Sequence, residues 1–164
     1  MSDRTRTRYE IDLVDIPVLP APPGVLLRPV SVSDREALAD LMLDAYIGTI
    51  DYDGEDLDDA RDEIDSYLSA APSLRHSVIA QIGDEVASSV LVARAEDTPL
   101  VAYVMTRAAH KGRGLGRLVT SVALSALAAD GRQTVELFIT DGNTPSERLF
   151  RSLGAVRRPG PRPV

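Results

Sequence analysis

The sequence predicts a mixed α/β fold in a single domain, and three observations support this prediction. The chain has 164 residues, which is enough to bury one hydrophobic core. Apolar residues recur at a spacing of three and four in some segments and alternate or run continuously in others, as they do in helices and strands. Along the chain these segments follow the order strand, two helices, three strands, helix, strand and helix.

The first half of the chain holds one predicted strand and two predicted helices. Residues 25–30 form the strand, after a Pro-rich connector over 17–24. Ser33 and Glu36 have the spacing of a capping box, which predicts the start of a helix. Its apolar face would comprise Ala37, Leu38, Leu41, Met42 and Ala45. A second, short helix is predicted over 57–68, with inward side chains at Leu57, Ile64 and Leu68.

The second half holds most of the predicted sheet. Residues 77–82 and 86–94 form a hairpin that turns at Gly83. Residues 100–106 are an almost continuous apolar run, which predicts a central strand buried on both faces. Residues 134–140 alternate apolar and polar side chains and form a further strand.

Two helices flank that last strand. The clearest one is predicted over 115–129, where apolar residues recur at helical spacing: Leu115, Leu118, Val119, Val122, Ala123, Ala126 and Leu127. Gly131 ends it. Thr144 and Glu147, with a proline between them, have the spacing of a capping box for a final helix that stops at Gly154.

The composition limits the kinds of partner and setting. A net charge of −7 and the absence of Trp argue against nucleic-acid binding. The chain has no Cys, and His76 and His110 are far apart in the sequence, so neither a disulfide nor a metal site is predicted. No apolar run approaches the roughly 20 residues that span a membrane. Together with an N-terminus that lacks an apolar leader, these features predict a cytoplasmic protein. The use of Arg throughout, with Lys111 as the only Lys, suggests a bacterial genome rich in GC.

The segment 111–117, KGRGLGR, lies between the apolar strand and the clearest helix. Its three glycines have no Cβ, so the backbone can come close to a ligand. The N–H groups of the helix start would face that ligand, with the positive end of the helix dipole behind them. This arrangement predicts a phosphate or pyrophosphate site, to which positive charge is added by Lys111, Arg113 and Arg117.

Other interpretations of these glycines remain. A tight turn without any ligand would use the same residues. A dinucleotide-binding turn has the spacing G-x-G-x-x-G, whereas Gly112, Gly114 and Gly116 have the spacing G-x-G-x-G. A Walker loop has Lys followed by Ser or Thr after its last glycine, and here Arg117 follows instead.

The segment 106–117, TRAAHKGRGLGR, resembles the pyrophosphate loop of the GNAT acetyltransferases. The pattern of that family is Arg or Gln, two residues, Gly, one residue, and Gly or Ala. Gly114 and Gly116 match this pattern, and Lys111 stands in place of the Arg or Gln. A second family pattern, further along the chain, is matched by Asn143, Ser146, Leu149 and Gly154, and Phe150 falls on the position where Tyr is common.

The resemblance implies a mixed, mostly antiparallel sheet that is flanked by helices and splayed between the strands near 100–106 and 134–140. It implies an N-acetyltransferase that takes acetyl-CoA or another acyl-CoA as co-substrate and an amine of a small molecule or peptide as acceptor, without a metal. The pantetheine would pair with the backbone of Val104, Met105 and Thr106. The pyrophosphate would bind the loop of Lys111, Gly112, Arg113, Gly114, Leu115, Gly116 and Arg117. The thioester side would be lined by Asn143, Ser146 and Phe150.

The chain departs from the family at positions that move protons. Family members often carry Tyr at the position of Phe150 and Glu at the position of Leu100. Asp53 and Glu55 are therefore candidate general bases, although they also fit a solvated helix start. Their stretch, 51–65, holds nine acids and one Arg and could attract a cationic acceptor such as a polyamine, aminoglycoside or basic peptide. A catalytically weak or inactive acyl-CoA-binding regulatory module is the alternative function. Three tyrosines could contact the substrate, although packing is the favoured interpretation: Tyr46, Tyr52 and Tyr103.

The two ends of the chain bear on how the sheet is completed. GNAT relatives usually continue with two strands after the last helix, whereas only ten residues follow Gly154 here, and three are Pro. One short strand over 155–158 would fit, and the sheet edge would otherwise stay open. Residues 9–16 have a strand-like alternation, so we expect this arm to pair with the sheet, in its own chain or by exchange in a homodimer; the alternative is an unpaired tail. The chain would then divide into an arm, 1–24, and one acyltransferase domain, 25–164.

Overall fold

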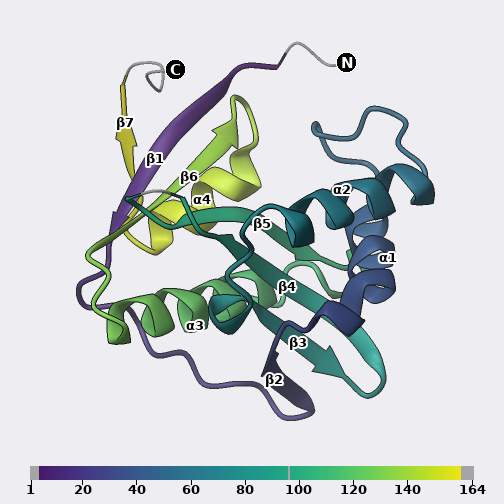
Figure 1. The fold of residues 1–164 in the computed structure, drawn as a ribbon, viewed down its shortest axis with the longest axis horizontal. Helices are drawn as coiled ribbons and strands as arrows, with labels where there is room; N and C mark the ends of the chain where they lie inside the picture. The colour runs from purple at the N-terminus through teal and green to yellow at the C-terminus, as the bar shows by residue number, and fades with distance from the viewer. Residues whose placement is uncertain (1–3, 96, 160–164) are drawn as a thin grey trace.

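A computed structural model describes residues 4–95 and 97–159. Within these residues seven strands form one sheet in the order β2-β3-β4-β5-β6-β1-β7 (Figure 1). All neighbouring strands are antiparallel except β5 and β6, which are parallel. The strands are β1 (Arg6–Asp12), β2 (Val25–Pro29), β3 (Val78–Ile82), β4 (Glu85–Ala93), β5 (Leu100–Thr106), β6 (Thr134–Thr140) and β7 (Val156–Arg158).

Helices cover both faces of this sheet and confirm the predicted fold class. On one face lie α1 (Arg35–Tyr46) and α2 (Leu57–Ser69), and on the other lie α3 (Leu115–Ala129) and α4 (Thr144–Ser152). Side chains of β3 alternate between them, because Ile79 packs toward α1 and α2 while Val78 and Ala80 pack toward α3. Among the residues that the structure describes, no helix is long and apolar enough to cross a membrane.

The α2 helix buries a different set of side chains from the one expected. Ala60, Ile64 and Tyr67 are buried, whereas Leu57 and Leu68 are only half-buried at its two ends. Tyr67 was missed because a tyrosine in a helix of acids looks polar. Its hydroxyl donates to the Val92 carbonyl oxygen at 2.7 Å, which satisfies the polar end of the buried ring.

The sheet is splayed between β5 and β6, as predicted. The two strands pair only at Leu100 with Glu136 and at Val101 with Leu137, and then diverge. The expectation that β5 is buried on both faces holds only in part: its side chains pack into the core on each face, but only Val101 and Met105 are buried. The rest of the strand is half-buried, since β5 has no neighbour along most of one edge.

The N-terminal strand β1 lies inside the sheet. It begins and ends earlier than the expected 9–16, at Arg6–Asp12, and Asp15 leaves the extended conformation with a φ of 54°. Its whole length pairs with β6, and its other edge pairs with the short C-terminal strand β7. These pairings are made within one chain, and they bury Tyr9 and Ile11 against α3 and α4.

Two expected helix caps were wrong by a few residues. Instead of Ser33 and Glu36, Ser31 and Asp34 form the capping box, and it opens a 3₁₀ turn (Val32–Asp34) ahead of α1. Instead of Thr144 and Glu147, Asn143 caps α4 by accepting a hydrogen bond from the Ser146 N–H at 3.2 Å. In both places a better placed acceptor lies just upstream, and spacing alone does not show it.

Asp34 also joins α1 to the sheet. Its carboxylate accepts two hydrogen bonds from Arg28 of β2, at 2.8 and 2.9 Å, and one from the Ser31 N–H at 2.8 Å. The Arg28 guanidinium lowers the pKa of Asp34 below its usual 3.8, against the opposing effect of burial. The resulting stabilisation is therefore present above the usual pKa and is lost as the pH falls through the lowered one.

We expect Asp34→Asn to lower the free energy of unfolding at pH 7 by about 1–3 kcal/mol, because a charge-assisted contact is lost. The difference from the wild type should shrink as the pH falls below about 4, where the wild-type carboxylate also becomes protonated. Urea unfolding at several pH values measures this. A difference that does not depend on pH would contradict it.

Replacing Ile11 by Ala tests whether β1 is integral to the fold. Ile11 is fully buried between the sheet and α3, so its truncation should lower the free energy of unfolding by about 2–5 kcal/mol. Asp12→Ala, at the next and exposed position, is the matched control and should change little. Equal unfolding midpoints for the two variants would show that β1 contributes little.

Candidate active site

The turn between β5 and α3 has a backbone that requires glycine at two positions. A 3₁₀ turn (Ala108–His110) follows β5, and then Gly112 and Gly114 have φ values of 81° and 78°. A Cβ at either position would meet nothing within 4 Å, so the left-handed conformation, and not lack of space, favours glycine there. Gly114 is the N-cap of α3 and has no side chain to cap the helix with.

Six consecutive backbone N–H groups in this turn have no acceptor among the described residues. They belong to residues 112–117, and the first satisfied amide of the helix is that of Leu118, which donates to the Gly114 oxygen at 3.0 Å. They lie at the positive end of a helix of 15 residues. Such a row of amides can bind an anion.

Gly116 has a different reason to be glycine. A Cβ there would lie 3.3 Å from Thr106 Oγ1, 3.5 Å from Val104 Cγ1 and 3.6 Å from Leu149 Cδ1. Its φ is not in the left-handed region, so the requirement is close packing of α3 against β5 and α4. The sequence pattern predicted a glycine that approaches a ligand, and the structure shows one that brings the helix close to the sheet.

The three expected cations of the turn have different roles. Lys111 Nζ donates to the Ala45 carbonyl oxygen at 2.7 Å and thereby fastens the turn to the C-terminal end of α1. Arg117 Nε donates to Ser152 Oγ at 3.1 Å, next to α4. Arg113 is exposed, and its side chain forms no hydrogen bond or ion pair with the part of the chain that the structure describes. It is therefore the cation best able to meet a bound phosphate.

The free edge of β5 presents backbone groups to the gap where β5 and β6 diverge, which we call the splay. The Arg107 N–H donates to the Ala87 oxygen at 2.8 Å, which fixes the phase of the antiparallel ladder with β4. Alternate residues therefore direct their N–H and C=O groups away from β4, and these include Val104 and Thr106. The backbone groups of Met105 point toward β4 instead, and its side chain is buried, so Met105 does not contribute to this free edge.

The residues expected around a thioester are only partly open to the splay. Asn143 Oδ1 caps α4, and its Nδ2 donates to Asp51 Oδ2 at 3.1 Å. Ser146 is half-buried in the first turn of α4. Phe150 is buried in the core with 6% of its surface exposed, so it packs the α4 side of the sheet.

The two expected general bases lie in an exposed loop between α1 and α2. Glu55 Oε2 accepts a hydrogen bond from the Asp53 N–H at 2.7 Å. This contact is the main cause that lowers the pKa of Glu55 and thereby weakens it as a base. Glu55 is exposed, and this contact lies within the loop itself.

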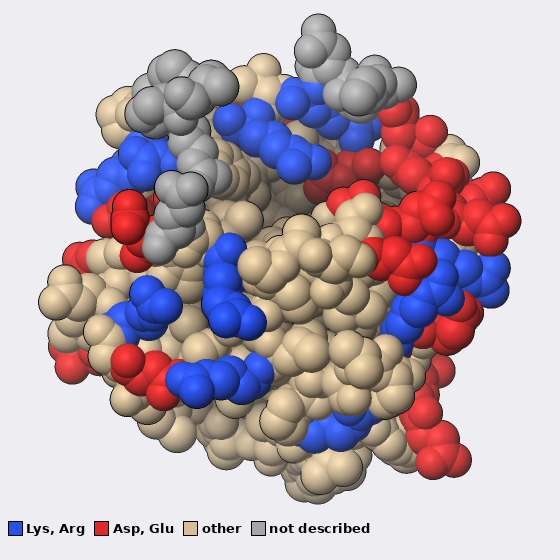
Figure 2. All heavy atoms as spheres, in the orientation of Figure 1, with Lys and Arg blue, Asp and Glu red and all other residues tan. Residues whose placement is uncertain are grey.

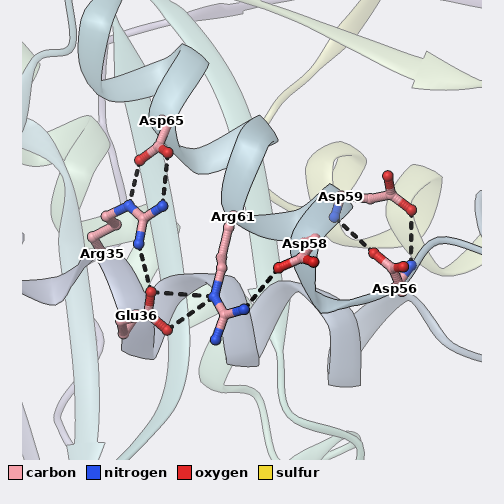
Figure 3. Close-up of polar contacts among 7 residues, drawn as sticks. All are labelled: Arg35, Glu36, Asp56, Asp58, Asp59, Arg61 and Asp65. Carbon is pink, nitrogen blue, oxygen red and sulfur yellow. Dashed lines mark hydrogen bonds and ion pairs between the residues drawn. The ribbon is translucent and has the colours of Figure 1, made fainter.

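Four of the nine acids of the 51–65 stretch stabilise the helices α1 and α2. Arg35 binds Asp65, and Arg61 binds both Glu36 and Asp58 (Figure 3). Asp56 and Asp59 form the capping box of α2, with both contacts at 2.9 Å. The acidity of the stretch therefore reflects helix capping and pairing at these positions.

Sequence reasoning missed Glu63, which lies with Tyr103 and Tyr46, two tyrosines for which packing was the favoured interpretation. The Tyr103 hydroxyl, on β5, donates to a carboxylate oxygen of Glu63 on α2. Burial raises the pKa of Tyr46, at the end of α1, to about 12, and burial also raises the pKa of Tyr103. Tyr67 holds the Tyr103 ring edge-on, with ring centroids 6.5 Å apart. Only the position of Tyr103 in the apolar run 100–106 could have pointed to them.

A Ser–His–Asp group elsewhere in the fold is structural. Ser73 Oγ lies 2.6 Å from His76 Nδ1, and His76 Nε2 contacts Asp130 at the C-terminal end of α3. Ser73 and His76 are buried, so the hydroxyl is not open to a substrate. The group fastens the turn before β3 to the end of α3 that is opposite the glycines.

Comparisons with known proteins agree with this geometry. Residues 25–156 match the model of the acetyltransferase (GNAT) domain family. A GCN5-related N-acetyltransferase from Sphaerobacter thermophilus superimposes with a TM-score of 0.74 at 17% identity, covering 94% of this chain and 49% of that one. A tandem GNAT protein from the clavulanic acid biosynthesis pathway superimposes with a TM-score of 0.70 at 15% identity, covering 95% and 51%.

A curated relative matches a shorter segment. It is a mycothiol acetyltransferase from Gordonia bronchialis, 45% identical over 49 residues, which are 30% of this chain and 16% of that protein. This chain therefore spans about half the length of the two structures and a smaller part of the curated relative. The family model, in contrast, covers most of the chain from β2 to β7. The chain belongs to the GNAT acetyltransferase family.

Proposed function

We propose that this chain is an acyl-CoA-dependent N-acyltransferase that transfers an acyl group, acetyl from acetyl-CoA, directly to a primary amine of a small molecule or peptide. The observation that carries this proposal is the row of unsatisfied amides over 112–117 beside the free edge of β5. The row of amides can bind an anion, and the free edge of β5 can pair with an extended chain that contains amides. Acyl-CoA has both parts, a pyrophosphate and a pantetheine arm. The short match to a mycothiol acetyltransferase is too limited to carry over that protein's substrate.

The proposed binding mode assigns each part of the co-substrate to groups of this chain. The backbone of Val104 and Thr106 would pair with the pantetheine amides, and the amides of 113–117 would bind the pyrophosphate, with Arg113 beside them. Residues 104–164 carry ten basic and four acidic side chains, which favours a phosphate-rich ligand despite the net charge of −7.

The chain's own groups limit how the transfer proceeds. A backbone N–H on the free edge of β5 would stabilise the negative charge on the carbonyl oxygen. Phe150 cannot donate a proton and is buried, so the sulfur would leave as a thiolate, which a thiol pKa of about 8.5 permits. A missing general acid lowers the rate by about 10²–10⁴. We therefore propose a slow enzyme with direct transfer.

The absence of family residues at Leu100 and Phe150 supports a second candidate, a regulatory module that binds acyl-CoA without turnover. We further propose that the chain consists of an arm, residues 1–24, which adds a strand to one acyltransferase domain, residues 25–164. We also propose that the protein is bacterial and cytoplasmic. Because β1 pairs within its own chain, the proposed fold does not require a homodimer.

We expect Gly114→Val to weaken coenzyme A binding about tenfold or more, because the side chain would stand over the amides and strain the turn. Gly131→Val is the matched control, since Gly131 also has a positive φ and open space but lies at the other end of α3. Titration calorimetry measures both variants. Equal affinities would contradict the site.

With acetyl-CoA and a panel of primary amines, we expect thiol release that depends on the amine. Formation of the acetylated amine, followed by mass spectrometry, separates transfer from hydrolysis. Coenzyme A binding without any product would favour the regulatory module. Absence of both binding and product would contradict the whole proposal.

A further inference from the structure

A cluster of four side chains lies at the open end of the splay, which we call the tyrosine–carboxylate cluster: Tyr46, Asp51, Glu63 and Tyr103. They come from the end of α1, the loop after it, α2 and β5. Tyr103 donates to Glu63, and the charges of Asp51 and Glu63 both act on Tyr46. Asp51 accepts a hydrogen bond from Asn143, just after β6, so the cluster spans the gap between the two diverging strands.

The surface is hollowed at this place. Figure 2 shows a depression between red side chains over α2 and its preceding loop and blue side chains over β1. Glu63 is exposed and Tyr103 is half-buried, so the carboxylate is open to solvent while the ring that holds it is packed. A ligand in the hollow could reach the carboxylate directly.

Asp51 and Glu63 differ from the other acids of their stretch. Asp56, Asp58, Asp59 and Asp65 are engaged in the network of α1 and α2 (Figure 3). The contacts of Asp51 and Glu63 are instead with Asn143, the N-cap of α4 just after β6, and with Tyr103 on β5. Asp51 and Glu63 are therefore distinguished by where they lie and what they contact, and the overall acidity of the stretch is not part of the argument.

The cluster has a net negative charge at neutral pH. Both tyrosine hydroxyls stay protonated, because burial raises the pKa of Tyr46 to about 12 and also raises the pKa of Tyr103. Among the described residues, the charges that act on the two hydroxyls are those of Asp51, Glu63 and Arg6 of β1. Two carboxylates and two hydroxyls form a receptor for a cation that also donates hydrogen bonds.

The cluster is also close to the proposed acyl-binding edge. Tyr103 directly precedes Val104 on β5, and Thr106 is three residues further on. At a rise of about 3.3 Å per residue, the cluster begins within about 10 Å of that edge. An acceptor held at the cluster could therefore place a second end at the edge.

We propose that Glu63, positioned by Tyr103 and assisted by Asp51, binds a positively charged group of the acceptor, and that the acceptor is a diamine or polyamine. This inference rests on the proposed function. The reacting nitrogen must be neutral to attack, so the charge that the carboxylates hold is that of a second amine on the same molecule. The neutral nitrogen forms a C–N bond with the thioester carbonyl carbon, the C–S bond breaks, and the thiolate takes up the proton that the nitrogen loses.

Three probes of matched chain length test this with acetyl-CoA: putrescine, n-butylamine and γ-aminobutyrate. We expect the wild type to have its highest kcat/KM with putrescine and its lowest with γ-aminobutyrate. Glu63→Gln should raise the KM for putrescine about tenfold to a hundredfold and leave n-butylamine unchanged, because only the charge contact is removed. Tyr103→Phe should raise the same KM by a smaller factor, with little change in kcat.

Asp62→Asn is the matched control, because it removes one charge from the adjacent, exposed position of α2 and should leave the KM unchanged. Calorimetric titration of putrescine into the coenzyme A complex measures acceptor binding even without turnover. Equal putrescine affinity in the wild type and Glu63→Gln, or equal kcat/KM for the three amines, would overturn the inference. If the inference fails but n-butylamine is still acetylated, the proposed acyltransferase function stands. If the protein does not bind coenzyme A, the proposed function itself is overturned.

Discussion

The early end of the ladder between β5 and β6 is the constraint on which the rest of the structure depends. The two strands share only two residue pairs, so the remainder of β5 has backbone groups without a strand partner. In a continuous sheet those groups would be satisfied by β6, and no extended ligand could pair with them. The gap therefore creates the edge, and the loop before α2 bridges its open end through the contact of Asp51 with Asn143.

The N-terminal strand makes this gap possible. A strand that leaves one neighbour needs another, and β1 pairs with all of β6, from Arg6 opposite Thr140 to Asp12 opposite Thr134. The alternation of Tyr9 and Ile11 fills the core on the α3 side, so β6 is held by its other edge. The C-terminal strand β7 then needs only three residues, because it covers the outer edge of β1 and supports no ligand-binding edge itself.

The local sequence pattern was sufficient to predict the bounds of those elements that are determined by residues close to them in the sequence. The bounds of α3 and β6 agree with the predicted 115–129 and 134–140, because each has a complete apolar period and a clear end signal. The need for a positive φ at Gly112 and Gly114 is also local, although these glycines were interpreted as allowing the backbone to approach a ligand. The reason for Gly116 could not be predicted, because Thr106 and Leu149 approach it from other elements. Asn143 was assigned to a ligand and found as a helix cap, since one amide can serve either and the sequence does not show which.

The acidic stretch shows the same limit most clearly. Its nine acids look alike in the sequence, yet the structure divides them by the side of the helix on which they lie. Asp65 and Asp58 face arginines of the α1–α2 pair, while Glu63 lies between them in sequence and contacts Tyr103 on the sheet. Helix positions two residues apart point in different directions. A count of charges therefore predicts the sign of the electrostatic field, but it does not show which acid contacts which partner. A single tertiary contact, from a tyrosine on the splayed strand, distinguishes the carboxylate that borders the site from those that build the fold.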